Sequence, residues 1–131
     1  MNTHTIADLP TKNMLIQSTG EALGRAILLS RACGLDRFFV WQEELLPGHR
    51  ASSPHYHTEK EEMIVMLSGS LRVQCGDLEW DVNSGQCVGF KPGERKFHVI
   101  KNISDKVAVY LGIASNSPDD EVIYQSKNKD C

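Results

Sequence analysis

The chain has 131 residues, of which 40% are hydrophobic, and a formal net charge of −3 at pH 7. This length suits one domain with a buried core and is too short for two ordinary domains. Acidic and basic residues are mixed along the chain, so no basic stripe is present that would bind nucleic acid or an anionic membrane. Because the sequence also lacks a long apolar run and a secretory signal, we expect a cytoplasmic protein.

The four cysteines are scattered and none of them forms a C-x-x-C pair. They are Cys33, Cys75, Cys87 and Cys131. In a reducing compartment we expect four free thiols. A bridge between Cys75 and Cys87 is the alternative, and the expected compartment argues against it.

The N-terminal third of the chain carries the least regular pattern. Residues 1–20 contain one proline and show no sustained hydrophobic period, so we expect a short arm laid over the domain. Residues 21–32 fit two interpretations, because their apolar residues have helical spacing but Gly24 interrupts the pattern. We favour a strand over residues 25–30.

From residue 37 onward, short apolar runs alternate with turn residues at regular intervals. This pattern is typical of an antiparallel sandwich or barrel. The further predicted strands are residues 37–46, 63–67, 71–75, 78–82, 86–90, 96–103, 107–113 and 122–124. The nine strands, with no convincing helix, predict an all-β fold with one domain over residues 21–125 and a disordered tail over residues 126–131.

One of these strands carries information about assembly. The run from Met63 to Leu67 is apolar on both faces, whereas one face of a two-sheet sandwich is normally wet and polar. Something must therefore cover the second face. We expect a homodimer, although the N-terminal arm could cover this face within one chain.

The histidines predict a metal site. Side chains two apart in a strand project from the same face, so His55 and His57 can converge on one ion while Tyr56 points away. Glu62 follows closely, and His98 lies further along the chain. Imidazole nitrogens together with a carboxylate suit Fe, Mn, Co, Ni or Zn, whereas Ca or Mg would want oxygen ligands alone.

These residues lie in two glycine-flanked blocks. The first block contains, in order, Gly48, His55, His57, Glu62 and Gly69. The second block contains Gly85, Pro92, Gly93, His98 and Asn102. The two blocks resemble the sequence motifs of the cupin superfamily. The flanking residues 35–47 and 117–120 look like those of a group of small bacterial single-domain cupins whose activity is mostly unassigned. The resemblance implies a double-stranded β-helix, or jelly-roll barrel, preceded by the short arm.

The resemblance also implies the ligands of one divalent transition metal, which are His55, His57, Glu62 and His98. Among three neighbouring glutamates, the family offset selects Glu62 as the inward one and leaves Glu59 and Glu61 solvated. Three neutral imidazoles and one carboxylate would leave an octahedral ion with two open positions. Open positions are what a catalytic or ligand-binding metal requires.

Other residues have weaker claims to the site. We expect His49 to be an exposed turn histidine, and Asn102 to tie backbone near the site or to support a ligand. Phe39 and Trp41 could line the mouth of the barrel, but packing is the commoner use of such aromatic residues. Three arginines could bind an acidic substrate, and their spacing does not indicate which of them faces inward: Arg50, Arg72 and Arg95.

Two classes of function follow from the resemblance. The first is a metalloenzyme that binds a small-molecule ligand and acts as an O₂-dependent dioxygenase, an isomerase or a decarboxylase. The alternative is a non-enzymatic sensor or carrier of a small ligand or metal. Because the chain has no room for a helix-turn-helix, such a sensor would act through a separate partner protein. The spacing places no general base beyond the ligands.

Overall fold

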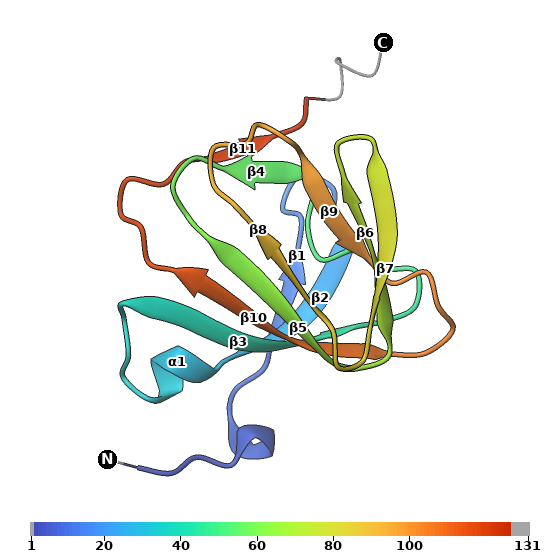
Figure 1. The fold of residues 1–131 in the computed structure, drawn as a ribbon. Coiled ribbons are helices and arrows are strands. Elements are labelled where there is room, and N and C mark those ends of the chain that lie inside the picture. Colours follow the sequence, from blue (N-terminus) through green and yellow to red (C-terminus); the bar gives the residue numbers. More distant parts are fainter. Residues whose placement is uncertain (1, 127–131) are drawn as a thin grey trace.

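The computed structural model describes residues 2–126 and forms two antiparallel sheets rolled into a barrel (Figure 1). The elements in chain order are the 3-10 turn Ile6–Asp8, β1 Lys12–Leu15, β2 Ala22–Leu28, α1 Leu29–Ala32, β3 Phe38–Leu45, β4 His55–His57, β5 Glu62–Ser68, β6 Ser70–Cys75, β7 Leu78–Asn83, β8 Cys87–Phe90, β9 His98–Lys101, β10 Ala108–Ser115 and β11 Val122–Tyr124. One sheet has the order β1-β2-β3-β10-β5-β8 and the other β11-β4-β9-β6-β7. This arrangement confirms the predicted all-β jelly-roll fold.

The first predicted strand, residues 25–30, is shifted relative to the structure. β2 covers Ala22–Leu28 and is followed by the single helical turn α1, so residues 29–30 are helical and the expectation of no helix is wrong at this point. The side chain of Ser30 explains the change of direction. Its buried hydroxyl accepts a hydrogen bond of 3.0 Å from the backbone N–H of Val40, which ties the turn onto β3.

Part of the expected N-terminal arm belongs to a sheet. Residues 12–15 form the edge strand β1, which pairs antiparallel with β2. A strand edge offers unpaired backbone N–H and C=O groups that a chain of almost any sequence can satisfy. Hydrophobic periodicity was therefore a poor guide to β1.

The hydrophobic core is built from residues of both sheets and takes none of its buried members from β4. Its buried members are Leu45, Ile64, Met66, Leu71, Val73, Val82, Ile100, Ala108 and Tyr110. Strand β5 runs from this core to a predicted ligand, because Met66 and Ile64 are buried and Glu62 lies next on the same face of the strand. The predicted inward orientation of Glu62 follows from this alternation.

The opposite face of β5 is largely exposed within the described residues 2–126. Met63 is 42% exposed and Leu67 is 47% exposed. Strand β1 cannot cover them, because β2, β3 and β10 separate β1 from β5 in the same sheet. The N-terminal arm is therefore not the cover for this face, and the expected homodimer stays a prediction.

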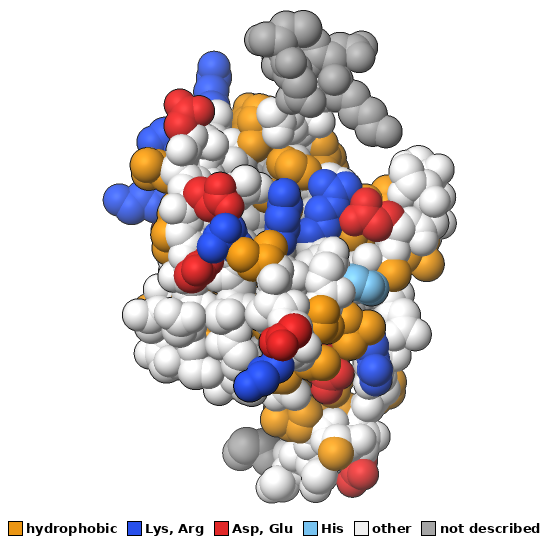
Figure 2. Space-filling model, turned by 90° about the vertical axis from the view of Figure 1, so that its right-hand side faces the viewer, with side chains coloured by type: hydrophobic (Ala, Val, Ile, Leu, Met, Phe, Trp, Pro, Cys, Tyr) orange, Lys and Arg blue, Asp and Glu red, His pale blue; other side chains and the backbone are white. Residues whose placement is uncertain are grey.

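The remaining surface is mixed in charge. Figure 2 shows acidic and basic side chains interspersed on the face that carries β6 and β7. On these strands Arg72 donates hydrogen bonds to Asp81 at 2.8 Å and 3.2 Å. Among the described helices, none is long and apolar enough to cross a membrane.

Three of the four cysteines lie in the described part of the chain. Cys33, Cys75 and Cys87 are free thiols, so the alternative bridge between Cys75 and Cys87 is not formed. Cys131 and the predicted disordered tail, apart from Ser126, lie outside the described residues.

Candidate metal centre

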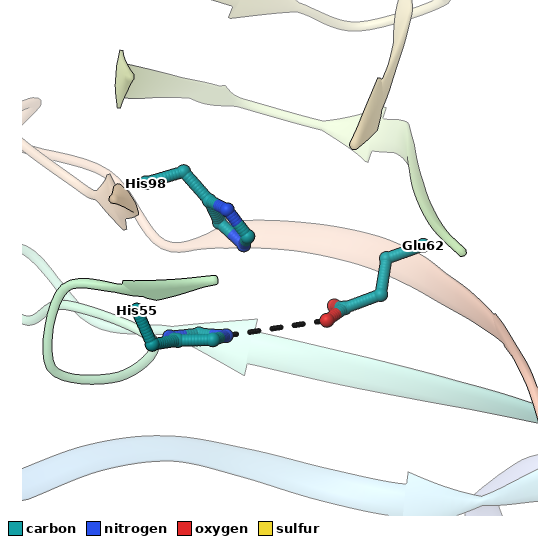
Figure 3. Close-up of side chains that lie close together, drawn as sticks. All are labelled: His55, Glu62 and His98. Atoms are coloured by element: carbon teal, nitrogen blue, oxygen red, sulfur yellow. Dashed lines mark ion pairs between the residues drawn. The ribbon is translucent and has the colours of Figure 1, made fainter. Parts of the chain in front are cut away.

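Three of the predicted ligands meet inside the barrel. The donor atoms of His55, Glu62 and His98 lie within 4.8 Å of one another. Figure 3 shows the three side chains converging on one space from separate strands. His55 on β4 is directly opposite His98 on β9, and Glu62 enters from the first position of β5. Strand pairing therefore brings together residues that are distant in sequence.

The fourth predicted ligand, His57, joins the group through Glu62. Its Nε2 atom contacts Oε1 of Glu62, and its ring lies perpendicular to that of His55 with 5.0 Å between the centroids. The side chain between them in sequence, Tyr56, instead packs on the ring of Phe97. The alternation expected for a strand is thus present in β4.

Hydrogen bonds orient both imidazoles of β4. Nδ1 of His55 lies 2.8 Å from the backbone oxygen of Ser53, and Nδ1 of His57 lies 2.8 Å from Oδ2 of Asp120. A carbonyl and a carboxylate can only accept, so each Nδ1 carries the proton and each Nε2 keeps its lone pair. These are the tautomers that metal-binding histidines adopt.

Asp120 supports the candidate site, and it was not singled out from the sequence. Its side chain is 6% exposed, and its second oxygen accepts hydrogen bonds of 2.9 Å from the backbone N–H groups of Glu59 and Lys60. Asp120 thereby holds His57 and the loop after β4 at the same time. It is 63 residues from His57 in the chain, so no local spacing could have indicated the pair.

For Glu62 and His98, the electrostatics favour the protonation states that bind metal, whereas the carboxylates of Glu62 and Asp120 outweigh burial and raise the pKa of His57. Burial would raise the pKa of Glu62, but the neighbouring His55 and His57 outweigh it and hold that pKa below its ordinary value. Burial, reinforced by the nearby His55, lowers the pKa of His98 to about 4. At neutral pH the centre therefore offers an ionised carboxylate and a neutral imidazole, as metal ligation requires.

An unsatisfied oxygen supports a cation at this position. Oε1 of Glu62 is buried, contacts Nε2 of His57 and makes no hydrogen bond within the described residues. Leaving a buried charged acceptor unpaired is costly. A divalent cation between the carboxylate and the imidazoles would remove this cost, and three nitrogens with one oxygen suit a transition metal. The residues present therefore fit such an ion.

A cavity of about 340 Å³ opens beside the centre and includes His55, His57 and Glu62 in its wall. The rest of its wall combines apolar and charged side chains, among them Met14, Phe39, Trp41, Glu43, Lys12 and Lys60. A smaller cavity of about 110 Å³ continues inward between Glu43, Tyr110 and His98. Phe39 and Trp41, which we expected to be packing residues, thus line the space in front of the candidate ligands.

The position of Trp41 depends on a glycine. A Cβ atom at Gly112 would lie 2.0 Å from the indole ring of Trp41, so the ring rests on a backbone that carries no side chain. Gly112 is directly opposite Trp41 in the pairing of β3 with β10. Close approach of this kind is a frequent reason for glycine within a strand.

Glu43 is a second residue that our sequence reasoning did not single out. Glu43 is 7% exposed, and its Oε2 accepts a hydrogen bond from the hydroxyl of Tyr110. Burial raises the pKa of Glu43 to about 7, although Tyr110 and Trp41 act in the opposite direction. The alternation of Trp41, Glu43 and Leu45 along one strand face was a usable signal, because it places a carboxyl on the core side.

Other sequence candidates lie elsewhere. His49 is half-buried and not exposed as expected, because its Nδ1 lies 3.2 Å from the backbone oxygen of Leu23. Asn102 ties backbone, donating hydrogen bonds to the carbonyls of Leu45 at 2.8 Å and Lys106 at 2.7 Å. This side chain is fully buried, and its hydrogen bonds tie together the end of β3 and the loop before β10.

None of the three candidate arginines lines either cavity at the centre. Arg50 forms a bidentate pair with Glu21, with N–O distances of 2.7 Å and 2.9 Å. Arg72 is paired on the outside of the barrel, and Arg95 is exposed.

Comparison with known proteins agrees with this geometry. A family model described as a cupin domain matches residues 41–114, which include all four predicted ligands. The chain belongs to the cupin superfamily. No curated protein sequence matches this cupin.

Solved structures show the same fold. A sugar phosphate isomerase of the cupin superfamily from Silicibacter pomeroyi is 28% identical with a TM-score of 0.75, and the match covers 79% of this chain and 66% of that one. The present chain thus spans slightly under two thirds of that protein. A proposed sugar phosphate isomerase from Acidithiobacillus ferrooxidans is 24% identical with a TM-score of 0.83, covering 91% and 76% of the two chains.

A third similar structure is a polyketide cyclase, RemF, from Streptomyces resistomycificus. It is 21% identical with a TM-score of 0.76, and the match covers 97% of this cupin and 88% of the cyclase. At this level of identity the likeness establishes the shared fold.

Proposed function

We propose that this cupin is a metal-dependent enzyme of the isomerase type that acts on a small anionic hydroxy-carbonyl compound. In this proposal His55, His57, Glu62 and His98 hold one divalent transition metal. The observation that carries the proposal is the buried Glu62 oxygen, which has no hydrogen bond and faces imidazole nitrogens beside an open cavity. When bound, the ion would supply a Lewis acid that polarises a substrate oxygen.

The cavity supports a small substrate. Its volume of about 340 Å³ is near the lower limit of ordinary ligand sites, which begin at about 300 Å³. Phe39 and Trp41 contribute apolar side chains to its wall, which also includes the predicted ligands His55, His57 and Glu62. A compound of a few carbons could fit in this cavity and reach the ion.

Charge in the wall supports an anionic substrate. Lys12 on β1 and Lys60 after β4 both line the cavity, and the ammonium of Lys60 lies 5.4 Å from the centre of the Phe39 ring. A phosphate or carboxylate group would compensate these two positive charges. The descriptions of two similar structures as sugar phosphate isomerases point in the same direction.

Metal analysis tests the first half of the proposal. We expect protein purified without a histidine tag to contain a stoichiometric transition metal by mass spectrometry. The double variant His55→Ala with His57→Ala should lose the metal and remain folded by circular dichroism, because neither histidine is a member of the hydrophobic core. His4→Ala, at an exposed position near the N-terminus, is the matched control. Equal metal content in the double variant and the control would contradict the ligand assignment.

Turnover tests the second half. Metal-free protein is loaded separately with Fe, Mn, Co, Ni or Zn under anaerobic conditions and offered hydroxy-aldehydes and hydroxy-ketones, each with and without a phosphate group. We expect isomer formation by nuclear magnetic resonance without O₂, with a preference for the phosphorylated compounds.

Three other outcomes of the same assay would overturn the isomerase proposal. Turnover that requires both Fe(II) and O₂ would indicate a dioxygenase, and release of CO₂ from acids would indicate a decarboxylase. Tight binding of metal and ligand without any turnover would indicate the sensor or carrier.

A further inference from the structure

We propose that Glu43 is the proton-transferring residue of this site and that Tyr110 positions it. The inference rests on the proposed function, because it assigns a role within the same cavity. It concerns a residue outside the four predicted ligands and outside the two sequence blocks that contain them.

Geometry places the Glu43 carboxyl between the two cavities. Glu43 lines the outer cavity together with His55 and Glu62, and it lines the inner one together with His98 and Tyr110. A substrate bound in the outer cavity would therefore share its walls with Glu43 and with three of the predicted ligands. General acid–base catalysis requires such reach, either directly or through one water.

The surroundings hold the carboxyl in one position. The hydroxyl of the fully buried Tyr110 donates to Oε2 of Glu43, and Tyr110 lies directly opposite Glu43 in the pairing of β3 with β10. On the other side, a Cβ atom at Gly24 would lie 2.5 Å from Oε2 of Glu43. The carboxyl thus occupies space that a glycine on β2 leaves open.

Glu43 has no cationic partner among the described residues. The side chains that donate hydrogen bonds to it, Tyr110 and Trp41, are uncharged. The exposed Glu44 beside it, in contrast, pairs with Arg25. The titratable groups that share a cavity wall with it are Lys12 on β1, His55 and His57 on β4, Lys60 after β4, Glu62 on β5, His98 on β9 and Tyr110 on β10. A buried acid without a salt-bridge partner, placed in a cleft, is characteristic of functional sites.

A purely structural role explains these observations less well. A glutamine of the same shape could accept the hydrogen bond from Tyr110 without the cost of burying an ionisable group. Glu43 also lines both cavities beside the predicted ligands. A role in proton transfer therefore explains best why this position carries a carboxylic acid.

The proposed step is balanced without any further reactant. The Glu43 carboxylate removes the proton from the hydroxyl-bearing carbon next to the carbonyl. The C–H electron pair forms a C=C bond to the carbonyl carbon, and the C=O π pair moves onto the carbonyl oxygen, which gives an enediolate. The hydroxyl proton moves to that oxygen, a C=O bond forms at the carbon that carried the hydroxyl, and the C=C pair takes the proton back from the Glu43 carboxylic acid at the former carbonyl carbon. One substrate carbon is oxidised and its neighbour is reduced, so no external oxidant or reductant is needed and the Glu43 carboxylate is regenerated.

The test compares Glu43→Gln with Glu44→Gln, its exposed neighbour on the same strand. We expect Glu43→Gln to keep its metal and to lose turnover by about 10²- to 10⁴-fold, the usual contribution of a general acid–base group. Glu44→Gln should match the wild type. Equal turnover of the two variants would overturn the proposal, whereas absence of metal in the wild type would overturn the proposed function instead.

Tyr110→Phe tests the positioning role. Loss of the hydroxyl removes a hydrogen bond that favours the ionised carboxylate, so the acidic limb of the kcat/KM profile should move to higher pH. A merely structural tyrosine would lower turnover or stability without moving this limb.

A third measurement depends on neither metal nor substrate. In metal-free protein, the infrared difference between wild type and Glu43→Gln should contain a protonated carboxyl band that disappears as the pH rises through about 7. If the band is absent on the acidic side of that pH, Glu43 does not hold the proton and the proposal fails, whether or not any compound turns over.

Discussion

At the scale of single residues, the candidate ligands are held by groups that do not touch the ion themselves. His57 depends on Asp120, which accepts the Nδ1 proton and also anchors two backbone N–H groups of the following loop. Such support orients the ring and raises its basicity as a ligand. The charge of Asp120, and not only its shape, contributes to the site.

We therefore predict that Asp120→Asn weakens metal binding by about 10- to 100-fold, the usual cost of losing such support. The measurement is a competition titration against a chelator. Asp119→Asn is the matched control, since Asp119 is the exposed neighbour in the same turn. Equal affinities of the two variants would show that Asp120 is not needed to orient His57.

Glu43 should make stability depend on pH. Its pKa is raised from 4.5 to about 7 by burial, so between these values the folded protein keeps a proton that the unfolded chain has released. The free energy of unfolding should thus fall as pH rises through this window, by up to about 3 kcal/mol at about 1.4 kcal/mol per pH unit. Other groups, among them His98, titrate in both proteins, so urea titrations across the window should show this slope as the difference between the wild type and Glu43→Gln. Parallel slopes in the two proteins would contradict the shift.

At the scale of elements, the central strand β10 arranges the site in layers. Tyr110 lies opposite Glu43 on one side and Met66 on the other, and two residues later Gly112 lies between Trp41 and Ile64. In the next layer, Ala114 of β10 lies opposite Glu62 of β5. One strand thus relates the core, the buried acid, the aromatic wall and a predicted ligand through its two-residue period.

Gly112→Ala should disturb this layering. The added methyl group would overlap the Trp41 ring, so we predict a loss of about 1 to 3 kcal/mol in the free energy of unfolding, as for other overpacked sites. Gly89→Ala on β8 is the control, because its nearest contact would be an ordinary 3.8 Å. Chemical denaturation measures both, and equal stability would mean that the indole ring moves aside without cost.

The elements were largely predictable. All nine predicted strands have counterparts in the structure, because alternation and turn residues are local signals. Two strands of the structure, β1 and β4, were not predicted from the sequence. β1 is held by backbone pairing to the edge of β2, and β4 has only three residues, too few for a detectable period. The helical turn α1 was missed because a buried serine contact decides it.

At the scale of the whole molecule, the uncovered face of β5 bears on assembly. A groove of about 580 Å³ on this face is lined by Phe38, Met63 and Ile113 among others. Apolar grooves of this kind are commonly covered in an oligomer. We retain the prediction of a homodimer that packs through the outer face of β5.

The prediction is tested by light scattering after size-exclusion chromatography. The wild type should have the mass of a dimer, and Met63→Glu with Leu67→Glu should have that of a monomer, because two buried charges would oppose association. Leu78→Glu, which alters an exposed leucine of the other sheet, should remain dimeric. A monomeric wild type at micromolar concentration would refute the interface.

The sequence alone determined the fold class, the cupin resemblance and the inward orientation of Glu62. All of these depend on residues close together in the chain, where side-chain alternation and turn chemistry act directly. Only the tertiary structure decided what supports and surrounds the site. Asp120 meets His57 across 63 residues, and Tyr110 meets Glu43 across 67. Strand pairing between distant segments creates these contacts, and no local pattern encodes which distant strands become neighbours.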